Sequence, residues 1–400
     1  MRVVHVVPVL TSRFGGPAVH VVEASLAASA FGVIPVVVST DLARPPSMDP
    51  EFVSDSAQFP DGVEQLDLHL CRSSWPYRFA YSPELKDVLR REVMRADLIR
   101  IHSLFLFPQY VAFRQALRAD VPYMVSFHGA LDPYLRKRGR VRKWLTDVAW
   151  QAEMLNRAPA IHVTSSDERT LTADVATDVP RVLLSNGIDW ARFQDLPDGR
   201  EFRSARLDGH EGAIVLCLGR IARKKAPERL VYALSEVVRE HPATMLVFAG
   251  PDDEGLGTRL RKLARSLSVD ASVRFVGMLQ GEERLGALSA ATVWALPSHT
   301  ENFAVAAAEA MAAGLPVVLT PQVNIASDAE DAGAAVVTRT DAADLGKQLV
   351  RLLDDAELRR SLGQRAREHA KAYDWAHLGA EYARAYKEVI ARHRGNRVAA

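Results

Sequence analysis

Cysteine is scarce in this 400-residue sequence, and long hydrophobic runs are absent. The two cysteines, Cys71 and Cys217, follow no metal-binding or redox spacing, which excludes a disulfide framework and favours a reducing compartment. The apolar start of the chain is interrupted by His5 and Pro8 and lacks a small-residue cleavage pattern. We therefore expect neither a signal peptide nor a transmembrane helix, which needs roughly 18 or more apolar residues. The expected localisation is cytoplasmic, at most peripheral at the inner face of a membrane.

An excess of charge of either sign is also missing. The sequence has 50 basic and 49 acidic side chains, so it creates no general field for a nucleic acid, and we expect no such partner. Neither half begins with a strand that leads into G-x-G-x-x-G, which argues against an NAD-dependent dehydrogenase. The 48% hydrophobic and 25% charged content is typical of a globular protein, and the length suits two domains.

Short apolar runs alternate with amphipathic helical stretches along both halves of the chain. The runs are continuously apolar, which is typical of parallel strands covered on both faces. The strands predicted in the first half are Val3–Val9, Ile34–Ser39, Leu98–His102, Tyr123–His128, Ile161–Ser165 and Val182–Ser185. Those in the second half are Ala213–Gly219, Thr244–Gly250, Val273–Val276, Val293–Leu296 and Pro316–Thr320. The predicted helices include Ala18–Ala30, Pro83–Arg95, Val141–Asn156, Ala226–Glu240, Leu256–Ser268 and Ala304–Ala313.

This alternation predicts an α/β protein with two Rossmann-like, doubly wound parallel-sheet domains that face a central cleft. Turn and linker signals at 186–212, including Asn-Gly and Leu-Pro-Asp-Gly, separate a first domain, 1–185, from a second, 213–374. Ligands of open α/β sheets bind beyond the carboxyl ends of the strands, so the functional residues are expected there.

A cluster of cations follows the first strand of the second domain, in Gly219-Arg220-Ile221-Ala222-Arg223-Lys224-Lys225-Ala226-Pro227. A charge run in a loop is often only a solvated surface. At the carboxyl edge of a parallel sheet, however, forked guanidinium donors and a mobile ammonium group suit a phosphate.

A second motif is the segment from His299 to Pro316, which follows a predicted strand and contains an alanine-rich helix that ends at Gly314. Its plain interpretation is a capped, well-packed helix with Glu309 on a solvated face. Its functional interpretation is an anion site at the amides of Asn302–Ala304. In that case Glu309, two turns further along an apolar helix, needs a partner such as a pair of ribose hydroxyls.

These motifs together resemble the family 4 retaining glycosyltransferases (glycosyl transferases group 1), which have the two-domain GT-B fold. Glu301 and Glu309 with seven residues between them are similar to the E-x7-E signature of that family. Other similar segments occur in the family's order, namely Gly15-Gly16-Pro17, Phe127-His128-Gly129, Ser185-Asn186-Gly187-Ile188-Asp189, Gly219-Arg220 with Lys225, Phe248-Ala249-Gly250, Val273–Gly277 and Ala295–Ser298. The resemblance extends from residue 1 to beyond Trp375.

The resemblance implies transfer of a hexose from a UDP- or GDP-linked sugar to an acceptor hydroxyl, with retention and without a metal or other cofactor. Consistent with this, the sequence has no Asp-x-Asp pair of the metal-dependent kind. It implies catalytic roles for His128, Arg220, Lys225 and Glu301. It implies donor-binding roles for Gly15, Gly16, Gly219, Met278, Leu279, Asn302, Phe303, Ala304 and Glu309. It also implies that a C-terminal helix, 375–400, crosses back to the first domain.

Two departures from the family pattern concern the donor site. Asn302 stands where the family commonly has a glycine, and it adds a polar side chain beside the expected sugar. Ala226 stands where a glycine is frequent. For these reasons the sequence leaves the identity of the hexose open.

Acceptor-side residues are less clearly marked. His102 ends a predicted strand and is one candidate. Leu131–Trp144 places six cations beside apolar side chains, and is either a solvated loop or a patch for an anionic membrane surface or a glycolipid. The residues that form this patch are Arg136, Arg138, Arg142 and Trp144.

We therefore predict a hexosyltransferase with a nucleotide-sugar donor and a sugar or glycolipid acceptor, in bacterial polysaccharide or glycolipid assembly. A nucleotide-sugar epimerase and a catalytically silent nucleotide-sugar-binding protein remain the alternatives. The pairing of Glu301 with Glu309 argues against the first, and the retention of Arg220, Lys225 and His128 argues against the second.

Overall fold

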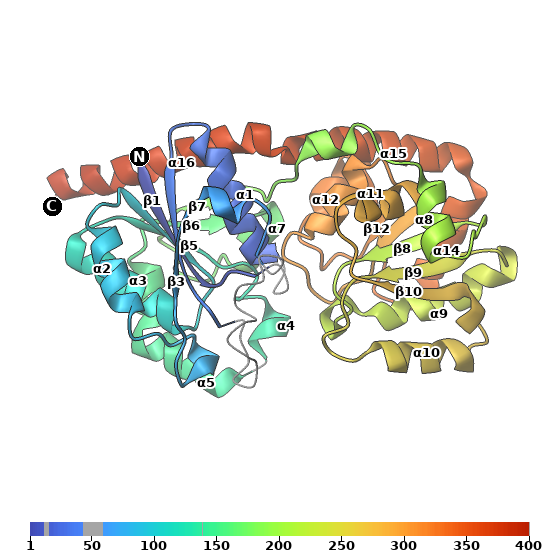
Figure 1. The fold of residues 1–400 in the computed structure, drawn as a ribbon, viewed down its shortest axis with the longest axis horizontal. Coiled ribbons are helices and arrows are strands. Elements are labelled where there is room, and N and C mark those ends of the chain that lie inside the picture. The colour runs from blue at the N-terminus through green and yellow to red at the C-terminus, as the bar shows by residue number, and fades with distance from the viewer. Residues whose placement is uncertain (12–15, 43–58, 138, 400) are drawn as a thin grey trace. The chain divides into compact units, whose positions relative to one another are not determined.

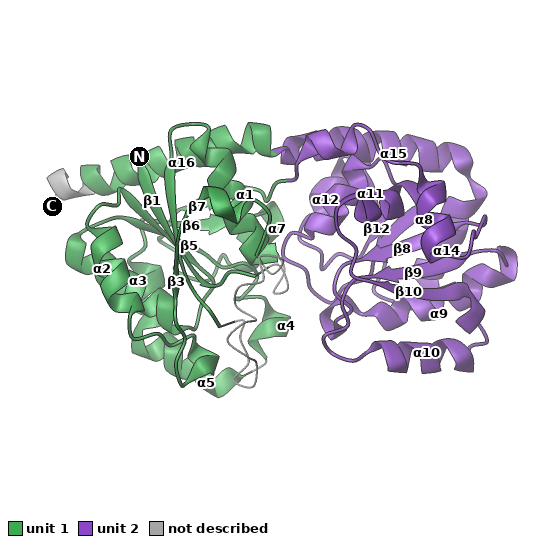
Figure 2. Ribbon diagram, in the orientation of Figure 1, with its two compact units in different colours: residues 1–187, 375–400 green, residues 188–374 purple. Residues whose placement is uncertain are grey.

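The computed structural model describes residues 1–11, 16–42, 59–137 and 139–399, and divides the chain into two compact units. Unit 1 comprises Met1–Gly187 and Trp375–Ala400, and unit 2 comprises Ile188–Asp374 (Figures 1 and 2). No helix among the described residues combines the length and the apolar character needed to cross a membrane.

The sheet of unit 1 is parallel throughout and, in the described residues, has the strand order β3-β2-β1-β4-β5-β6-β7. Its strands are β1 (Arg2–Val9), β2 (Ile34–Thr40), β3 (Asp67–Cys71), β4 (Leu98–His102), β5 (Tyr123–Ser126), β6 (Ala160–Val163) and β7 (Arg181–Leu183). Its helices are α1 (Gly16–Ser29), α2 (Leu85–Val93), α3 (Phe107–Ala119), α4 (Pro133–Arg136), α5 (Arg140–Thr146), α6 (Ala152–Asn156), α7 (Ser166–Leu171) and α16 (Trp375–Ala399).

Strand periodicity divides the core of unit 1 between the two faces of this sheet. Val4, Ile99 and Val125 belong to the core on the face that carries α2 and α3. Val3, Leu98 and Met124, one residue earlier on each strand, pack under α1 and α16. Helix α16 is therefore part of the core of unit 1, although it is separated from α1 by most of the chain.

Unit 2 contains a second parallel sheet, with the order β10-β9-β8-β11-β12-β13 in the described residues. Its strands are β8 (Ile214–Leu218), β9 (Met245–Ala249), β10 (Val273–Gly277), β11 (Val293–Leu296), β12 (Val317–Leu319) and β13 (Ala335–Val337). Its helices are α8 (Gly199–Arg206), α9 (Pro227–Glu240), α10 (Gly257–Ser266), α11 (Gly281–Ala290), α12 (Val305–Ala312), α13 (Ala326–Asp331), α14 (Ala342–Asp354) and α15 (Ala356–Ala370).

The segment predicted as a linker, 186–212, differs from the expectation. Apart from Asn186 and Gly187, it belongs to unit 2. Phe193, Phe202 and Leu207 are buried in the core of that unit, and α8 packs on α11. The apolar side chains of this segment outweigh its turn signals, so the separate linker is a wrong interpretation.

Candidate functional site

Glycine backbones join the carboxyl ends of the three strands β8, β9 and β10 in unit 2. The Gly219 N–H donates to the Ala249 carbonyl at 2.7 Å, and the Gly250 N–H donates to the Gly277 carbonyl at 2.7 Å. A Cβ at Gly250 would lie 2.2 Å from the Gly219 oxygen. Only glycine permits this approach, which places the cationic loop after β8 directly at the sheet edge where ligands of α/β folds bind.

Three cations of this loop act on the carboxylate of Glu301, which precedes α12. Lys224 Nζ lies 3.0 Å from Glu301 Oε2, and the Lys224 carbonyl accepts from the His299 N–H at 2.7 Å. Burial raises the pKa of the Glu301 carboxyl, but Lys224, Lys225 and Arg220 outweigh this effect and hold the pKa below its usual value. The Glu301 carboxylate therefore lies in the positive field of these three cations.

The predicted cations occupy different positions within this group. Lys225 extends over Gly219, where its Nζ lies 2.5 Å from the position that a Cβ would take. Lys224, which the sequence analysis did not select, forms the ion pair with Glu301. Ala226 has φ +48°, a left-handed conformation, which explains why glycine suits this position.

Helix α12 begins later than predicted. Ala304 is the residue before its first turn and has φ +61°, so the amides of Asn302 and Phe303 belong to the preceding turn and not to the helix. This turn is held in place because the Glu301 N–H donates to Gln322 and the Glu301 carbonyl accepts from Asn324, both at 3.0 Å. The Phe303 ring is buried and packs edge-on against Tyr373.

Glu309 has a protein partner that the sequence analysis missed. Arg284 of α11 forms an ion pair with this carboxylate, whose side chain is only 15% exposed. The pair brings α11 and α12 together beside the end of β10, where Met278 is exposed and Leu279 is buried. A signal for this pairing was absent because Arg284 lies 25 residues from Glu309 on a different helix.

Five histidines of unit 1 form a largely buried polar layer under α1 and α16, namely His5, His20, His102, His128 and His162. His128 follows β5, has φ +49°, and is half-buried, with its Nε2 2.9 Å from His102 Nδ1. His102 is buried, and its other nitrogen lies 3.2 Å from His5 Nδ1. Both nitrogens of His102 therefore face other histidines, and its role toward an acceptor stays a prediction.

A fully buried arginine lies in the same layer. Arg100 donates to Tyr386 Oη at 3.0 Å and to Ser126 Oγ at 2.7 Å, and its guanidinium lies 3.0 Å from His162 Nδ1. His20 of α1 stacks on His162. Burial, and then the charge of Arg100, lower the pKa of His5 and of His128 to about 3. Burial also holds the pKa values of His20, His102 and His162 well below their usual value.

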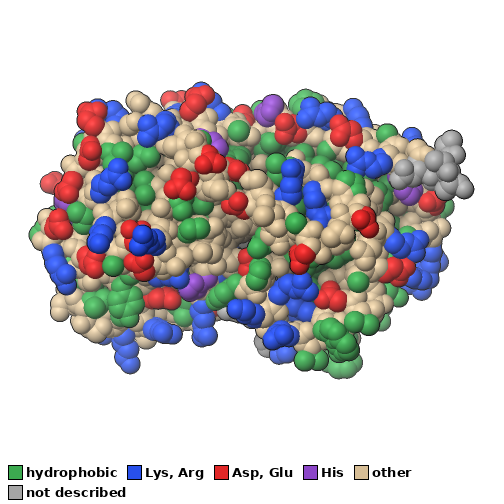
Figure 3. Space-filling view, turned by 180° about the vertical axis from the view of Figure 1, so that it is seen from behind, with side chains coloured by type: hydrophobic (Ala, Val, Ile, Leu, Met, Phe, Trp, Pro, Cys, Tyr) green, Lys and Arg blue, Asp and Glu red, His purple; other side chains and the backbone are tan. Residues whose placement is uncertain are grey.

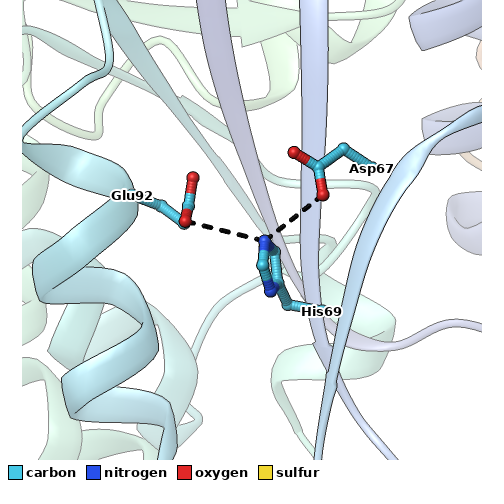
Figure 4. A group of neighbouring side chains, drawn as sticks. All are labelled: Asp67, His69 and Glu92. Atoms are coloured by element: carbon cyan, nitrogen blue, oxygen red, sulfur yellow. Dashed lines mark ion pairs between the residues drawn. The ribbon is translucent and has the colours of Figure 1, made fainter.

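A group with the composition of a metal site lies at the opposite, amino-terminal edge of the unit 1 sheet (Figure 4). His69 Nε2 is 3.4 Å from Asp67 and 3.7 Å from Glu92. Arg2 already pairs with both carboxylates, at 3.1 and 2.7 Å. Because this guanidinium supplies the neutralising charge, the group is interpreted as a structural ion-pair network.

The described residues of the predicted acceptor patch lie on α4 and α5, and the π-helical turn Asp147–Gln151 follows α5. Val141, Trp144, Leu145 and Val148 are between 55% and 74% exposed and follow helical spacing. Arg136 pairs with Asp147 at 3.5 Å, and the Arg142 guanidinium lies 5.8 Å from the centre of the Phe79 ring. In Figure 3, hydrophobic side chains gather at the lower right of the picture, with Lys and Arg side chains nearby.

Two other predicted site residues, Gly15 and Arg138, lie outside the described residues.

Comparison with solved structures shows that the chain has the two-domain GT-B fold. Sucrose-phosphate synthase from Thermosynechococcus elongatus matches with a TM-score of 0.75 and 20% identity, over 98% of this chain and 99% of that one. Anabaena Alr3699/HepE in complex with UDP-glucose matches with a TM-score of 0.76 and 16% identity, over 97% and 100%. These likenesses establish the predicted fold.

Sequence comparisons identify the family. The model of the glycosyl transferases group 1 family matches residues 199–369, and that of the glycosyl transferase 4-like domain matches residues 15–187. A D-inositol 3-phosphate glycosyltransferase of Frankia alni is 30% identical over 333 residues, covering 77% of this chain and 78% of the relative. Another, of Saccharomonospora viridis, is 35% identical over 240 residues, covering 58% of this chain but 55% of the relative. The chain belongs to the group 1 glycosyltransferases, as its motifs indicate.

Proposed function

We propose that the chain is a retaining hexosyltransferase of glycosyltransferase family 4, which uses a UDP- or GDP-linked sugar and no divalent metal. The observation that carries this proposal is the group of cations at the carboxyl end of β8, where Lys224 Nζ lies 3.0 Å from Glu301 Oε2 and Lys225 extends over Gly219. These cations lie where the fold binds nucleotides, and a diphosphate needs such positive charge around it. The lack of an Asp-x-Asp pair supports a protein-based substitute for the metal.

Each group then has a defined task in the transfer. Arg220 and Lys225 bind the diphosphate and stabilise the charge that it gains as its bond to the hexose breaks. Glu309, oriented by Arg284, accepts the ribose hydroxyls, and the backbone of Gly277–Leu279 flanks the base. Glu301 and the turn at Asn302–Ala304 bind the hexose hydroxyls.

Unit 1 binds the acceptor in this proposal, and His128 bonds to the sugar near its anomeric carbon. The acceptor oxygen forms its bond to that carbon on the face from which the diphosphate departs. The acceptor proton moves to the departing phosphate oxygen, so no side chain is assigned as a base. The transfer therefore takes no proton and no charge from any group outside the donor and the acceptor.

Alanine variants test the charge assignment. We expect Arg220→Ala and Lys225→Ala each to reduce turnover by roughly 10²–10³-fold, because each removes a principal donor to the leaving group. Arg223→Ala is the matched control, since Arg223 lies in the same loop but pairs with Glu254 at 3.6 Å. The assay is a panel of nucleotide-sugars scored for transfer and slow hydrolysis, with and without EDTA. Near-normal turnover in both site variants, or full loss with EDTA, would contradict the assignment, and epimerised donor would favour the epimerase alternative.

We also propose that the exposed patch on α5 binds an anionic membrane surface that presents a glycolipid acceptor. Its apolar stripe includes Trp144 and Leu145, and cationic side chains such as Arg136 and Arg142 flank it. This combination suits interfacial binding, in which apolar side chains insert and cations meet lipid phosphates.

Charge reversal at Arg136, Arg138 and Arg142 tests the membrane proposal. We expect reduced sedimentation with phosphatidylglycerol vesicles and a lost blue shift of Trp144 fluorescence, with unchanged binding of free UDP. Arg384→Glu is the control, because this 69% exposed arginine lies on α16, which packs on α1 at the other sheet face. Unchanged vesicle binding by the triple variant would refute the proposal.

A further inference from the structure

Three imidazoles form a continuous hydrogen-bonded row in unit 1. His5 Nδ1 lies 3.2 Å from His102 Nε2, and His102 Nδ1 lies 2.9 Å from His128 Nε2. The rings are nearly parallel, with interplanar angles of 15° and 17°. The row crosses three neighbouring strands, β1, β4 and β5, and only its last member, His128, is half-buried.

Each imidazole of the row is neutral at neutral pH, because burial and Arg100 oppose protonation. A bond between two neutral imidazoles needs an N–H on one and a lone pair on the other. The tautomers are therefore coupled. Either all three protons are on Nδ1 and the row donates toward His128, or all three are on Nε2 and the row donates toward His5.

The buried end of the row distinguishes these two arrangements. His5 Nε2 is buried and has no hydrogen-bond partner among the described residues. Protons on Nε2 would leave an N–H there without an acceptor, in the field of the buried Arg100 cation that faces His5 in the strand register. Protons on Nδ1 leave only a lone pair, and buried N–H groups without acceptors are the rarer case.

We propose that His5 and His102 are positioning residues that hold His128 in its Nδ1–H tautomer, so that His128 presents a hydrogen-bond donor and not a base. The backbone of His128 is left-handed, with φ +49°, and its ring lies 2.9 Å from His102 Nδ1 through Nε2. The partner of such a donor is an oxygen with free lone pairs, such as a sugar hydroxyl or a phosphate oxygen. The functional part rests on the proposed transfer reaction, whereas the tautomer does not depend on it.

Two-bond ¹H–¹⁵N correlation spectra of the full chain with ¹⁵N-labelled histidine test the tautomer directly, and a His128→Gln spectrum assigns the signal. We expect the Nδ1–H pattern for His128. His102→Asn keeps an N–H in the place of Nδ1–H and should retain this pattern. His102→Asp can only accept, and should convert His128 to Nε2–H. An Nε2–H pattern in the unsubstituted chain would overturn the proposal, even if the aspartate variant failed to fold.

Transfer kinetics separate positioning from a structural role. We expect His102→Asn to keep kcat within about fivefold, and His102→Asp and His128→Gln to reduce kcat by about 10²-fold, as for one lost transition-state donor. His377→Asn is the control, because that side chain is 68% exposed. Equal losses in the asparagine and aspartate variants would refute the positioning role. The Nδ1–H pattern without transfer from any nucleotide-sugar would refute the proposed function alone.

Discussion

Replacement of His20 by phenylalanine should flatten the acid dependence of the stability of unit 1. His20 is buried on α1, and neither of its ring nitrogens has a hydrogen-bond partner among the described residues. Burial, followed by the charges around it, holds its pKa well below the usual value. In the unfolded chain the same imidazole takes up a proton near pH 6.5. The contribution of His20 to stability is therefore present above this pH and is lost as the pH falls.

The magnitude follows from proton linkage. Below pH 6.5 the unfolded state binds one more proton at this residue than the folded state, which gives a slope of about 1.4 kcal/mol per pH unit. Between pH 7 and pH 5 the loss from His20 alone is about 2 kcal/mol. Four further histidines, at positions 5, 102, 128 and 162, act in the same direction.

Urea titrations at fixed pH, read by pulsed hydrogen exchange of β4 and β8 peptides, report on the two units separately. We expect His20→Phe to be at least as stable as the unsubstituted chain at pH 7.5, since it loses no hydrogen bond, and to have a slope smaller by about 1.4 kcal/mol per pH unit. His377→Phe, at a 68% exposed position, should leave the slope unchanged. Parallel pH profiles for His20→Phe and the unsubstituted chain would show that His20 is protonated or solvated in the folded state.

Two further predictions concern unit 2. Gly250→Ala should cost at least 2 kcal/mol in urea unfolding, because the new Cβ would lie 2.2 Å from the Gly219 oxygen. Gly255→Ala, with φ +66° but open space around it, should cost only about 1 kcal/mol, and equal losses would contradict the role of close approach. Arg284→Ala should weaken UDP binding by about tenfold in calorimetry, about 1.4 kcal/mol, because it leaves the Glu309 carboxylate without its partner. The control is Arg206→Ala, which breaks the ion pair between Arg206 of α8 and Glu283, a neighbour of Arg284 on α11. This variant should leave UDP affinity unchanged, and equal weakening would argue against a specific role for Arg284.

Most of the fold could be predicted because buried parallel strands leave a strong local signal. Leu98–His102 and Val293–Leu296 match their predicted limits, and most other predicted strands extend a few residues too far. Two edge strands were missed for physical reasons. Asp67–Cys71 alternates polar and apolar residues because it is an edge strand with one neighbouring strand, β2. Ala335–Val337 has only three residues, too few to give a recognisable strand pattern. Helix α3 was also missed, since its aromatic residues weaken its helical pattern.

The candidate site was predictable only where its residues are neighbours in sequence. The cationic loop and the turn before α12 each carry a local pattern, so Arg220, Lys225 and Glu301 could be selected. The partner of Glu301 could not be chosen between adjacent lysines, because a side chain's direction in a short turn depends on the tertiary contacts. Arg284 had no local signal at all, since its partner lies on another helix.

The histidine layer is the clearest case of information that exists only in three dimensions. His5, His20, His102, His128 and His162 are scattered over five separate elements or their ends, and no spacing relates them. Each one alone is most simply interpreted as a buried histidine with a local partner. Strand periodicity places four of them on one sheet face, and α1 supplies the fifth. Because a neutral imidazole can both donate and accept, the hydrogen bonds among His5, His102 and His128 convert three of these residues into a coupled system whose proton positions depend on one another. A substitution at His5 or His102 should therefore change the proton position at His128, the one member of the row that is only half-buried.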